Sequence, residues 1–155
     1  MSFEVTPLDE HNQALLNNVH PPDWRNPTPA DKYNLVVIGG GAAGLIVSIV
    51  TAGLGGKVAL VERNLMGGDC LNVGCVPSKA VIRSARFRSD MLRARELGWG
   101  PVDGVEVDFA AVMERMRRIR ATISDDDSAQ RYTDHGVDVF IGDGRFVDNN
   151  TVEVG

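Results

Sequence analysis

One segment of this sequence, residues 34–62, constrains the possible folds more than any other. Its residues 35–38 form a continuous apolar run, which is typical of a parallel strand buried on both faces. A glycine cluster follows at once, and residues 42–54 then predict an apolar helix that two further glycines end. Residues 57–61 predict a second strand, with Glu62 at its carboxyl end. This order predicts a βαβ unit, in which a helix joins two parallel strands.

The glycine cluster fits the pattern GxGxxG, with Gly39, Gly41 and Gly44 as its three glycines. In this pattern the first glycine permits a tight turn, the second lets a pyrophosphate approach the backbone, and the third packs the helix against the strand. The free amides and the positive end of the helix dipole can hold a diphosphate without a basic side chain. Glu62 stands 18 residues after Gly44, where we expect a surface carboxylate that accepts hydrogen bonds from a ribose diol. The segment therefore predicts dinucleotide binding.

The same segment permits a second interpretation, a membrane-spanning helix. Residues 35–56 carry no charge over 22 positions, and residues 40–44 satisfy the GxxxG pattern of packed transmembrane helices. Seven of these 22 residues are glycines, however, and β-branched residues cluster ahead of the glycines as in a strand. A spanning helix would also leave the strand at 57–61 without its partner. We therefore predict no membrane span.

The chain has two cysteines, Cys70 and Cys75, which lie in a glycine-rich run over residues 67–79. Residues five apart in a regular α-helix have Cα atoms about 8.6 Å apart, whereas a disulfide needs less than about 7 Å. The pair can therefore close only across a distorted turn, for which the glycines supply backbone freedom. A helix from Pro77 onward would favour thiolate at the nearby sulfurs. A redox dithiol beside a dinucleotide site is the leading interpretation.

The alternatives for the cysteines are two unrelated thiols or half of a zinc site. The chain has only three histidines and no CxxC pair, so a set of four metal ligands is not expected. We predict no metal site.

Residues 32–86 resemble the N-terminal FAD-binding segment of the pyridine nucleotide-disulfide oxidoreductases, the group of dihydrolipoamide dehydrogenase, glutathione reductase and mercuric reductase. The signature GGxCxNxGCxPSK matches residues 67–79 without a gap. Leu71 and the pair Ser78-Lys79 are more similar to the lipoamide dehydrogenase and mercuric reductase branch. The resemblance implies an α/β fold, namely part of a Rossmann-like, three-layer FAD-binding domain with a parallel sheet and a small β-hairpin.

The resemblance also implies roles for matching positions. The three glycines would face the FAD pyrophosphate, Glu62 the adenosine ribose, and Gly144 the adenine. Cys75 would lie next to the isoalloxazine, Cys70 would be the interchange thiol that attacks substrate, and Lys79 would approach the flavin near N5. Catalytic roles fall on Cys70, Cys75 and Lys79. The implied cofactor-binding residues are Gly39, Gly41, Ala42, Ala43, Gly44, Glu62, Arg63, Gly67, Gly68, Asp69, Cys70, Lys79 and Gly144.

The sequence divides into two parts. Residues 1–30 predict an N-terminal helix, with Asp9 as its N-cap, and a Pro-rich strap that Trp24 anchors by packing. Residues 31–155 predict the N-terminal part of the FAD-binding domain. The start of the chain has no basic region followed by an apolar region, so we expect no signal peptide and a cytoplasmic protein.

The second half of the chain predicts further regular elements. Helices are expected over 81–97 and 109–123, the latter capped by Asp108, followed by a strand over 136–141 and a hairpin over 142–154. The helices carry many arginines, but the chain has a net charge of −5 and a pI of about 5.1. We therefore expect solvated helix faces and salt bridges, not a nucleic-acid partner.

These observations predict a FAD-dependent NAD(P)H:disulfide or Hg(II) oxidoreductase that uses a Cys70–Cys75 redox disulfide. A dihydrolipoamide dehydrogenase-type enzyme and a non-catalytic flavin- or nucleotide-binding module are the alternatives. The sequence lacks a second GxGxxG for NAD(P)H and an interface domain, so the resemblance implies an N-terminal fragment of a homodimeric parent. By itself such a fragment is expected to bind FAD weakly and to be inactive toward small-molecule, disulfide or metal-ion substrates.

Overall fold

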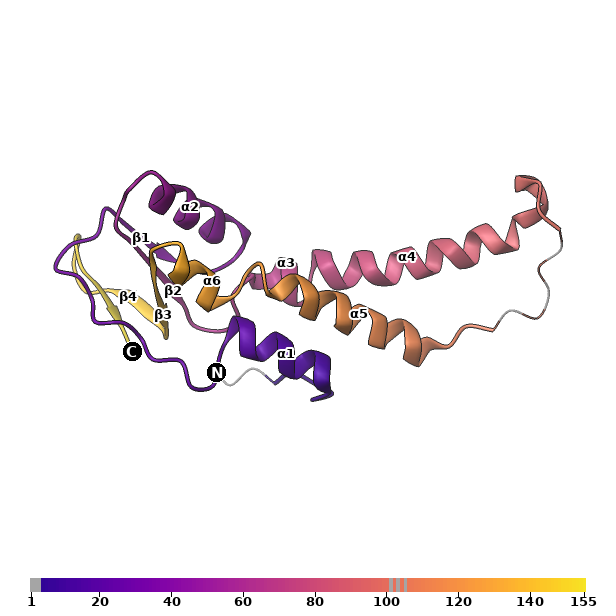
Figure 1. The fold of residues 1–155 in the computed structure, drawn as a ribbon, viewed down its shortest axis with the longest axis horizontal. Coiled ribbons are helices and arrows are strands. Elements are labelled where there is room, and N and C mark those ends of the chain that lie inside the picture. Colours follow the sequence, from indigo (N-terminus) through magenta and orange to yellow (C-terminus); the bar gives the residue numbers. More distant parts are fainter. Residues whose placement is uncertain (1–3, 101, 103, 105) are drawn as a thin grey trace.

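The computed structural model describes residues 4–100, 102, 104 and 106–155 as an α/β fold around a three-stranded parallel sheet (Figure 1). β1 (Leu35–Ile38) pairs with β2 (Val58–Glu62), which pairs in turn with β3 (Val137–Ile141). The central strand β2 is buried along its whole length, as its apolar sequence requires. The predicted strands and their parallel pairing are confirmed.

Helices cover one face of the sheet and a β-hairpin covers the other. α2 (Ala42–Gly53) and α6 (Ala129–Asp134) belong to the main core, which includes Leu45, Val58, Leu60, Tyr132, Val137 and Val139. The hairpin joins β4 (Gly144–Phe146) to β5 (Val152–Val154), and its Val154 packs on a second core made of Ala59, Val61 and Phe140. These layers confirm the predicted Rossmann-like, three-layer architecture.

The segment that follows β2 forms a helical arm. After the short α3 (Gly68–Asn72), the helices α4 (Cys75–Leu92) and α5 (Phe109–Ser124) lie side by side and extend away from the sheet (Figure 1). Asp108 caps α5 by accepting a hydrogen bond from the amide of Ala111, as predicted. The single helix expected over 81–97 is wrong in one respect, because α4 ends at Leu92 and a 3₁₀ turn, η1 (Ala94–Leu97), follows.

The N-terminal residues form a helix and an extended strap, as predicted. α1 (Glu10–Val19) is capped by Asp9, whose carboxylate accepts from the amide of Asn12 at 2.9 Å. The strap then runs along β3, where the Trp24 indole donates to the carbonyl of Val139 at 3.2 Å and packs on the main core. Asn26 exchanges two hydrogen bonds with the backbone of Ile141. Packing of Trp24 on the domain is thus confirmed.

The charge-free residues 35–56 do not form one continuous helix. They divide into β1, the glycine loop and α2. Over the part of the chain that the structure describes, no helix has both the length and the apolar character needed to cross a bilayer.

Candidate functional site

The glycine loop between β1 and α2 takes the conformation that its sequence predicts. Gly39 has a φ of +108°, which favours glycine, and its amide donates to the carbonyl of Val61 at 2.8 Å. A side chain on Gly44 would overlap the Gly39 carbonyl oxygen and lie 3.1 Å from Val37 Cγ1. The turn at Gly39 and the close packing at Gly44 are thus confirmed, while contacts of this loop with a pyrophosphate stay a prediction.

Glu62 is 8% exposed, so the expected surface carboxylate is wrong. Its Oε2 accepts from the amide of Gly40 at 2.6 Å, and its Oε1 accepts from the amide of Asn64 at 2.7 Å. The carboxylate therefore ties the glycine loop to the segment after β2. Each carboxylate oxygen still has a further lone pair, so a ribose hydroxyl remains a compatible partner.

The cysteine-bearing segment packs directly on the glycine loop. The Gly67 amide donates to the Gly40 carbonyl at 2.8 Å, and Gly67 forms an isolated parallel bridge with Gly41. Gly68 has a φ of +54°, and a Cβ there would lie 2.7 Å from the Gly41 Cα. Only a glycine combines this positive φ with so close an approach to another backbone. The glycine loop and the cysteine-bearing segment therefore pack closely against each other at Gly41 and Gly68.

A cleft of about 420 Å³ opens at the carboxyl ends of β1 and β2. Six of the predicted cofactor-binding residues line it, namely Gly39, Glu62, Arg63, Gly68, Asp69 and Gly144. The other predicted cofactor-binding residues lie outside its lining, namely Gly41, Ala42, Ala43, Gly44, Gly67, Cys70 and Lys79, and so does the predicted catalytic residue Cys75. Gly41 and Gly67 adjoin the cleft, because Gly67 precedes the lining residue Gly68 and a Cβ on Gly68 would lie 2.7 Å from the Gly41 Cα, and Cys70 follows the lining residue Asp69 in the chain.

Several lining residues were not predicted from the sequence. They are Ile38, Val61, Asn64, Leu65, Asn72, Val73, Gly142 and Asp143. Ile38 is the last residue of β1, and Val61 is the last but one of β2. The amide of Gly142 donates to the Glu62 carbonyl at 3.0 Å. The general rule that ligands bind at the carboxyl ends of parallel strands could have identified these positions.

The chain breaks its helix between the two cysteines. Cys70 lies in α3 and Cys75 opens α4, with Gly74 between them. The Gly74 amide donates to the Asp69 carbonyl at 2.5 Å, and a Cβ on Gly74 would lie 2.8 Å from that same oxygen. The predicted distorted turn is confirmed. Both cysteines are free thiols, and no cluster of three or more His, Cys, Asp or Glu side chains that could hold a metal occurs among the described residues.

The two thiols interact with each other. A hydrogen bond with Cys75, then burial, raise the pKa of Cys70 above its ordinary value, while attraction to Lys79 acts in the opposite direction. The amide of Cys75, at the start of α4, lowers the pKa of Cys70 in the direction expected of a helix N-terminus, but the Cys75 thiol and burial outweigh it, so the net shift is upward. Lys79 itself is exposed on α4.

Replacement of Cys75 by alanine is expected to lower the pKa of Cys70, because it removes the partner that holds the Cys70 proton. At a fixed pH below the ordinary thiol pKa, Cys70 should then contain more thiolate and react faster with iodoacetamide. The rate of Cys70 alkylation, followed from pH 6 to 10, measures this effect. Lys79→Gln is the opposing control, since it should raise the pKa of Cys70 and slow its alkylation.

The site combines a parallel sheet, a glycine loop that opens a helix, a carboxylate at the next strand end and a pair of neighbouring thiols. A dinucleotide is compatible with this arrangement, since four of the lining residues are glycines and the first amides of α2 have no partner within their own helix. These features define an α/β domain with a glycine loop of the dinucleotide-binding type and a neighbouring dithiol.

Comparison with known families makes the assignment specific. The model of the family "Pyridine nucleotide-disulphide oxidoreductase" matches residues 33–155. The chain belongs to this family.

Its relatives include two kinds of enzyme. The chain is 32% identical over 151 residues to "Mercuric reductase" of Lysinibacillus sphaericus, an alignment that covers 97% of this chain and 25% of the relative. It is also 32% identical over 123 residues to "Dihydrolipoyl dehydrogenase" of Acholeplasma laidlawii, with 79% of this chain and 36% of the relative covered. The chain thus spans about a quarter to a third of these relatives.

A solved structure shares the fold. It is described as the "Cu(II) complex of HOCl-induced flavoprotein disulfide reductase RclA from Escherichia coli". The superposition has a TM-score of 0.62 at 25% sequence identity and covers 78% of this chain and 24% of that one.

Proposed function

We propose that this chain forms the N-terminal FAD-binding segment of a flavoprotein that transfers electrons between NAD(P)H and a disulfide or metal-ion substrate. The observation that carries the proposal is the direct packing of the cysteine-bearing segment on the glycine loop through the Gly67–Gly40 hydrogen bond. Asp69, the residue before Cys70, lines the cleft. A dinucleotide in that cleft would therefore lie beside the dithiol.

The residues that would hold FAD surround this cleft. The amides at the start of α2 would face the diphosphate, Glu62 would accept from the ribose, and Gly144 would leave room for the adenine. Gly68 and Asp69 would continue the site toward the cysteines. When bound, FAD supplies the chemistry of accepting a hydride and passing on an electron pair.

The two thiols have different surroundings, which suits a division of roles. Cys75 is exposed at the start of α4, and Cys70 is partly buried in α3. Oxidation of the pair forms one S–S bond and releases two electrons and two protons, and reduction reverses this. The Lys79 cation favours the charged form of Cys70, so it would stabilise the thiolate once the Cys75 sulfur no longer holds the Cys70 proton.

Among substrates, the proposal favours the mercuric reductase type over the dihydrolipoyl dehydrogenase type. The alignment with the Lysinibacillus mercuric reductase extends over 97% of this chain and so includes most of the residues before β1. The alignments with the Acholeplasma dihydrolipoyl dehydrogenase and with a second mercuric reductase, from Bacillus cereus, each cover 79% of the chain, so the preference rests on the Lysinibacillus alignment alone. Hg(II) is thus the first substrate to test, with lipoamide second.

Cys70 and Cys75 are expected to form an intrachain disulfide when the folded chain is oxidised, because the turn between them already brings the thiols together. Titration with Ellman's reagent should count two thiols in the reduced chain and none after oxidation, and dithiothreitol should restore both. The Cys75→Ser variant should keep its single thiol under the same treatment. Two free thiols in an oxidised, folded sample would contradict the proposed redox role.

A further inference from the structure

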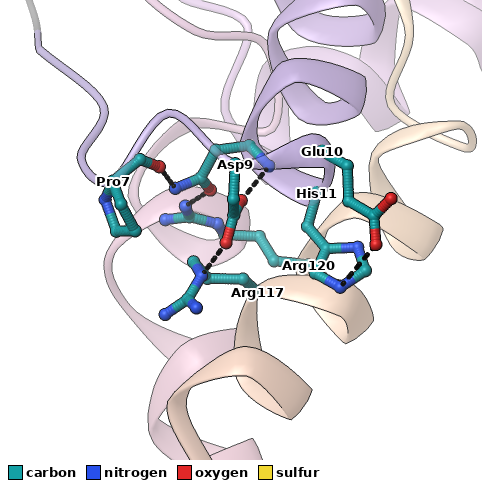
Figure 2. Close-up of polar contacts among 7 residues, drawn as sticks. Pro7, Asp9, Glu10, His11, Arg117 and Arg120 are labelled. Atoms are coloured by element: carbon teal, nitrogen blue, oxygen red, sulfur yellow. Dashed lines mark hydrogen bonds and ion pairs between the residues drawn. The ribbon is translucent and has the colours of Figure 1, made fainter. Parts of the chain in front are cut away.

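Arg120 of α5 joins the N-terminal helix to the cysteine-bearing segment. Its Nη1 donates to the backbone carbonyl of Asn72 at 2.7 Å, and its Nη2 donates to Oδ1 of Asn12. Asn12 lies on α1, is fully buried, and donates from Nδ2 to the Pro7 carbonyl at 2.6 Å. Figure 2 shows the Arg120 side chain reaching from α5 into this cluster. One guanidinium thus connects three segments that are distant in the sequence.

The carbonyl that Arg120 holds belongs to the turn between the two cysteines. Asn72 is the last residue of α3, two residues after Cys70 and three before Cys75. Its side-chain amide donates to the carbonyls of Met66 and Gly68, at 3.1 and 2.9 Å. Arg120 therefore restrains the backbone at the point where α3 ends and the chain turns toward α4.

The N-terminal segment contacts the same region at two further places. The Met66 amide donates to the Val19 carbonyl at 3.1 Å, and the His20 ring hydrogen-bonds to the carbonyl of Asn64. The buried side chains of Leu15 and Val19 share the main core with Met66 and Leu71. The cysteine-bearing segment is thus held between the glycine loop and α1.

The contact that Arg120 makes is specific, but it requires a positive charge to be partly buried, which costs free energy. Burial, then repulsion from Arg117, lower the pKa of Arg120, and attraction to Asp9 opposes them. Arginine nevertheless stays protonated in proteins, so a cation is held half-buried at this point. Its Nε has no hydrogen-bond partner among the described residues. An apolar side chain could pack here, but only the guanidinium fork can donate to Asn72 and Asn12 together.

We infer that Arg120 and Asn12 are positioning residues for the Cys70–Cys75 pair, and that α1 is therefore part of the redox site although it precedes the family-matched residues 33–155. The inference depends on the proposed redox role of the two cysteines. Arg120 keeps the turn ordered while both thiols are reduced, so disulfide formation has little further chain entropy to remove. Loosening the turn should make the disulfide easier to reduce.

The equilibrium with glutathione measures this effect on the 155-residue chain itself. In the forward direction Cys70 and Cys75 lose two electrons and two protons and form one S–S bond, and one glutathione disulfide is reduced to two glutathione thiols. The oxidised fraction is determined by thiol trapping and mass spectrometry over a series of glutathione ratios. No flavin or nicotinamide is needed, so the measurement is independent of cofactor binding.

Arg120→Gln and Asn12→Ala are expected to lower the equilibrium constant for disulfide formation by about three- to tenfold, since the first removes both charge-assisted hydrogen bonds of the connection and the second removes one of them. Arg120→Lys should restore part of the loss, because a lysine ammonium can still donate to the Asn72 carbonyl. The matched controls are Arg117→Gln and Asn18→Ala. Arg117 binds Asp9 at 2.5 Å and Asn18 binds Ser124 at 2.9 Å, so both controls cut contacts between α1 and α5 without touching Asn72.

A purely structural role would lower the denaturation midpoint in test and control variants alike and leave the disulfide equilibrium unchanged. Equal equilibrium constants in all variants, or equal shifts in tests and controls, would overturn the inference. If Arg120→Gln does not fold, Asn12→Ala and Arg120→Lys decide the question by the same criterion. Absence of any disulfide in the unmodified chain would instead overturn the proposed redox role itself.

Discussion

Replacing Gly44 by alanine is expected to destabilise the chain by about 3 kcal/mol and to weaken dinucleotide binding at least about tenfold. The added Cβ would overlap the carbonyl oxygen of Gly39 and lie 3.1 Å from Val37 Cγ1. Because backbone atoms of the glycine loop cannot turn aside as a side chain can, α2 must move away from β1. That movement displaces the amides at the start of α2, which would face the diphosphate. Urea denaturation and calorimetric titration with FAD measure the two effects.

Gly53→Ala is the matched control for this prediction. Gly53 lies at the other end of α2, and a Cβ there would meet no atom within 4 Å. The change should therefore leave FAD affinity unchanged and stabilise the chain by up to about 1 kcal/mol, since alanine is the better helix former. If Gly44→Ala behaved like Gly53→Ala, the close packing of α2 on β1 would not be the reason for this glycine.

The local geometry of the nucleotide loop could be predicted from the sequence because its constraints are local. Gly39 and Gly44 are required by a turn and a contact within a few residues of each other. The break between Cys70 and Cys75 was likewise predictable, because helix geometry alone forbids a disulfide across five regular helical residues. In each case the relevant distances are set by the backbone of one short segment.

Features that depend on distant partners could not be predicted in the same way. Glu62 is buried because the amide of Gly40, 22 residues earlier, folds back onto its carboxylate. Arg120 was expected on a solvated helix face, which is wrong, because α1 covers it and the acceptors Asn12 and Asn72 lie 108 and 48 residues away. For Arg117 the expected salt bridge is confirmed, with Asp9 as its partner. Amphipathic periodicity assigns a residue to a face but does not show which element packs on that face.

The cleft likewise combines residues that the local sequence predicts with residues that only the tertiary fold brings in. Its residues from β1 and β2 could be expected from the βαβ pattern, but Gly142 and Asp143 join it only because β3 pairs beside β2 and its end adjoins Glu62. The raised pKa of Cys70 also depends on tertiary geometry, since the Cys75 sulfur approaches it across the turn. The helix N-terminus alone favours the thiolate, but the second thiol reverses the net direction of the shift.

Glu62→Ala is expected to lower both stability and FAD affinity. The substitution leaves the buried amide of Gly40 and the half-buried amide of Asn64 without their acceptor. At about 1–3 kcal/mol for each of the two unsatisfied groups, the free energy of unfolding should fall by about 2–6 kcal/mol. Loss of a charged hydrogen bond to the ribose should weaken FAD binding by about tenfold or more. The fold would tolerate this change only if Glu62 were the surface carboxylate expected from the sequence, and Glu62 is buried.

Two further variants separate the structural effect of Glu62 from its effect on binding. Glu62→Gln keeps the shape and one acceptor oxygen, so it should recover part of the stability but little of the affinity, because the charge is lost. Asp143→Ala removes an exposed carboxylate from the same cleft, and it should leave stability nearly unchanged and not weaken FAD binding. Affinities are compared by calorimetry at a temperature where every variant is folded. If Glu62→Ala bound FAD as tightly as the unmodified chain does, Glu62 would not bind the ribose. The carboxylate would then serve only to join the glycine loop to the segment after β2.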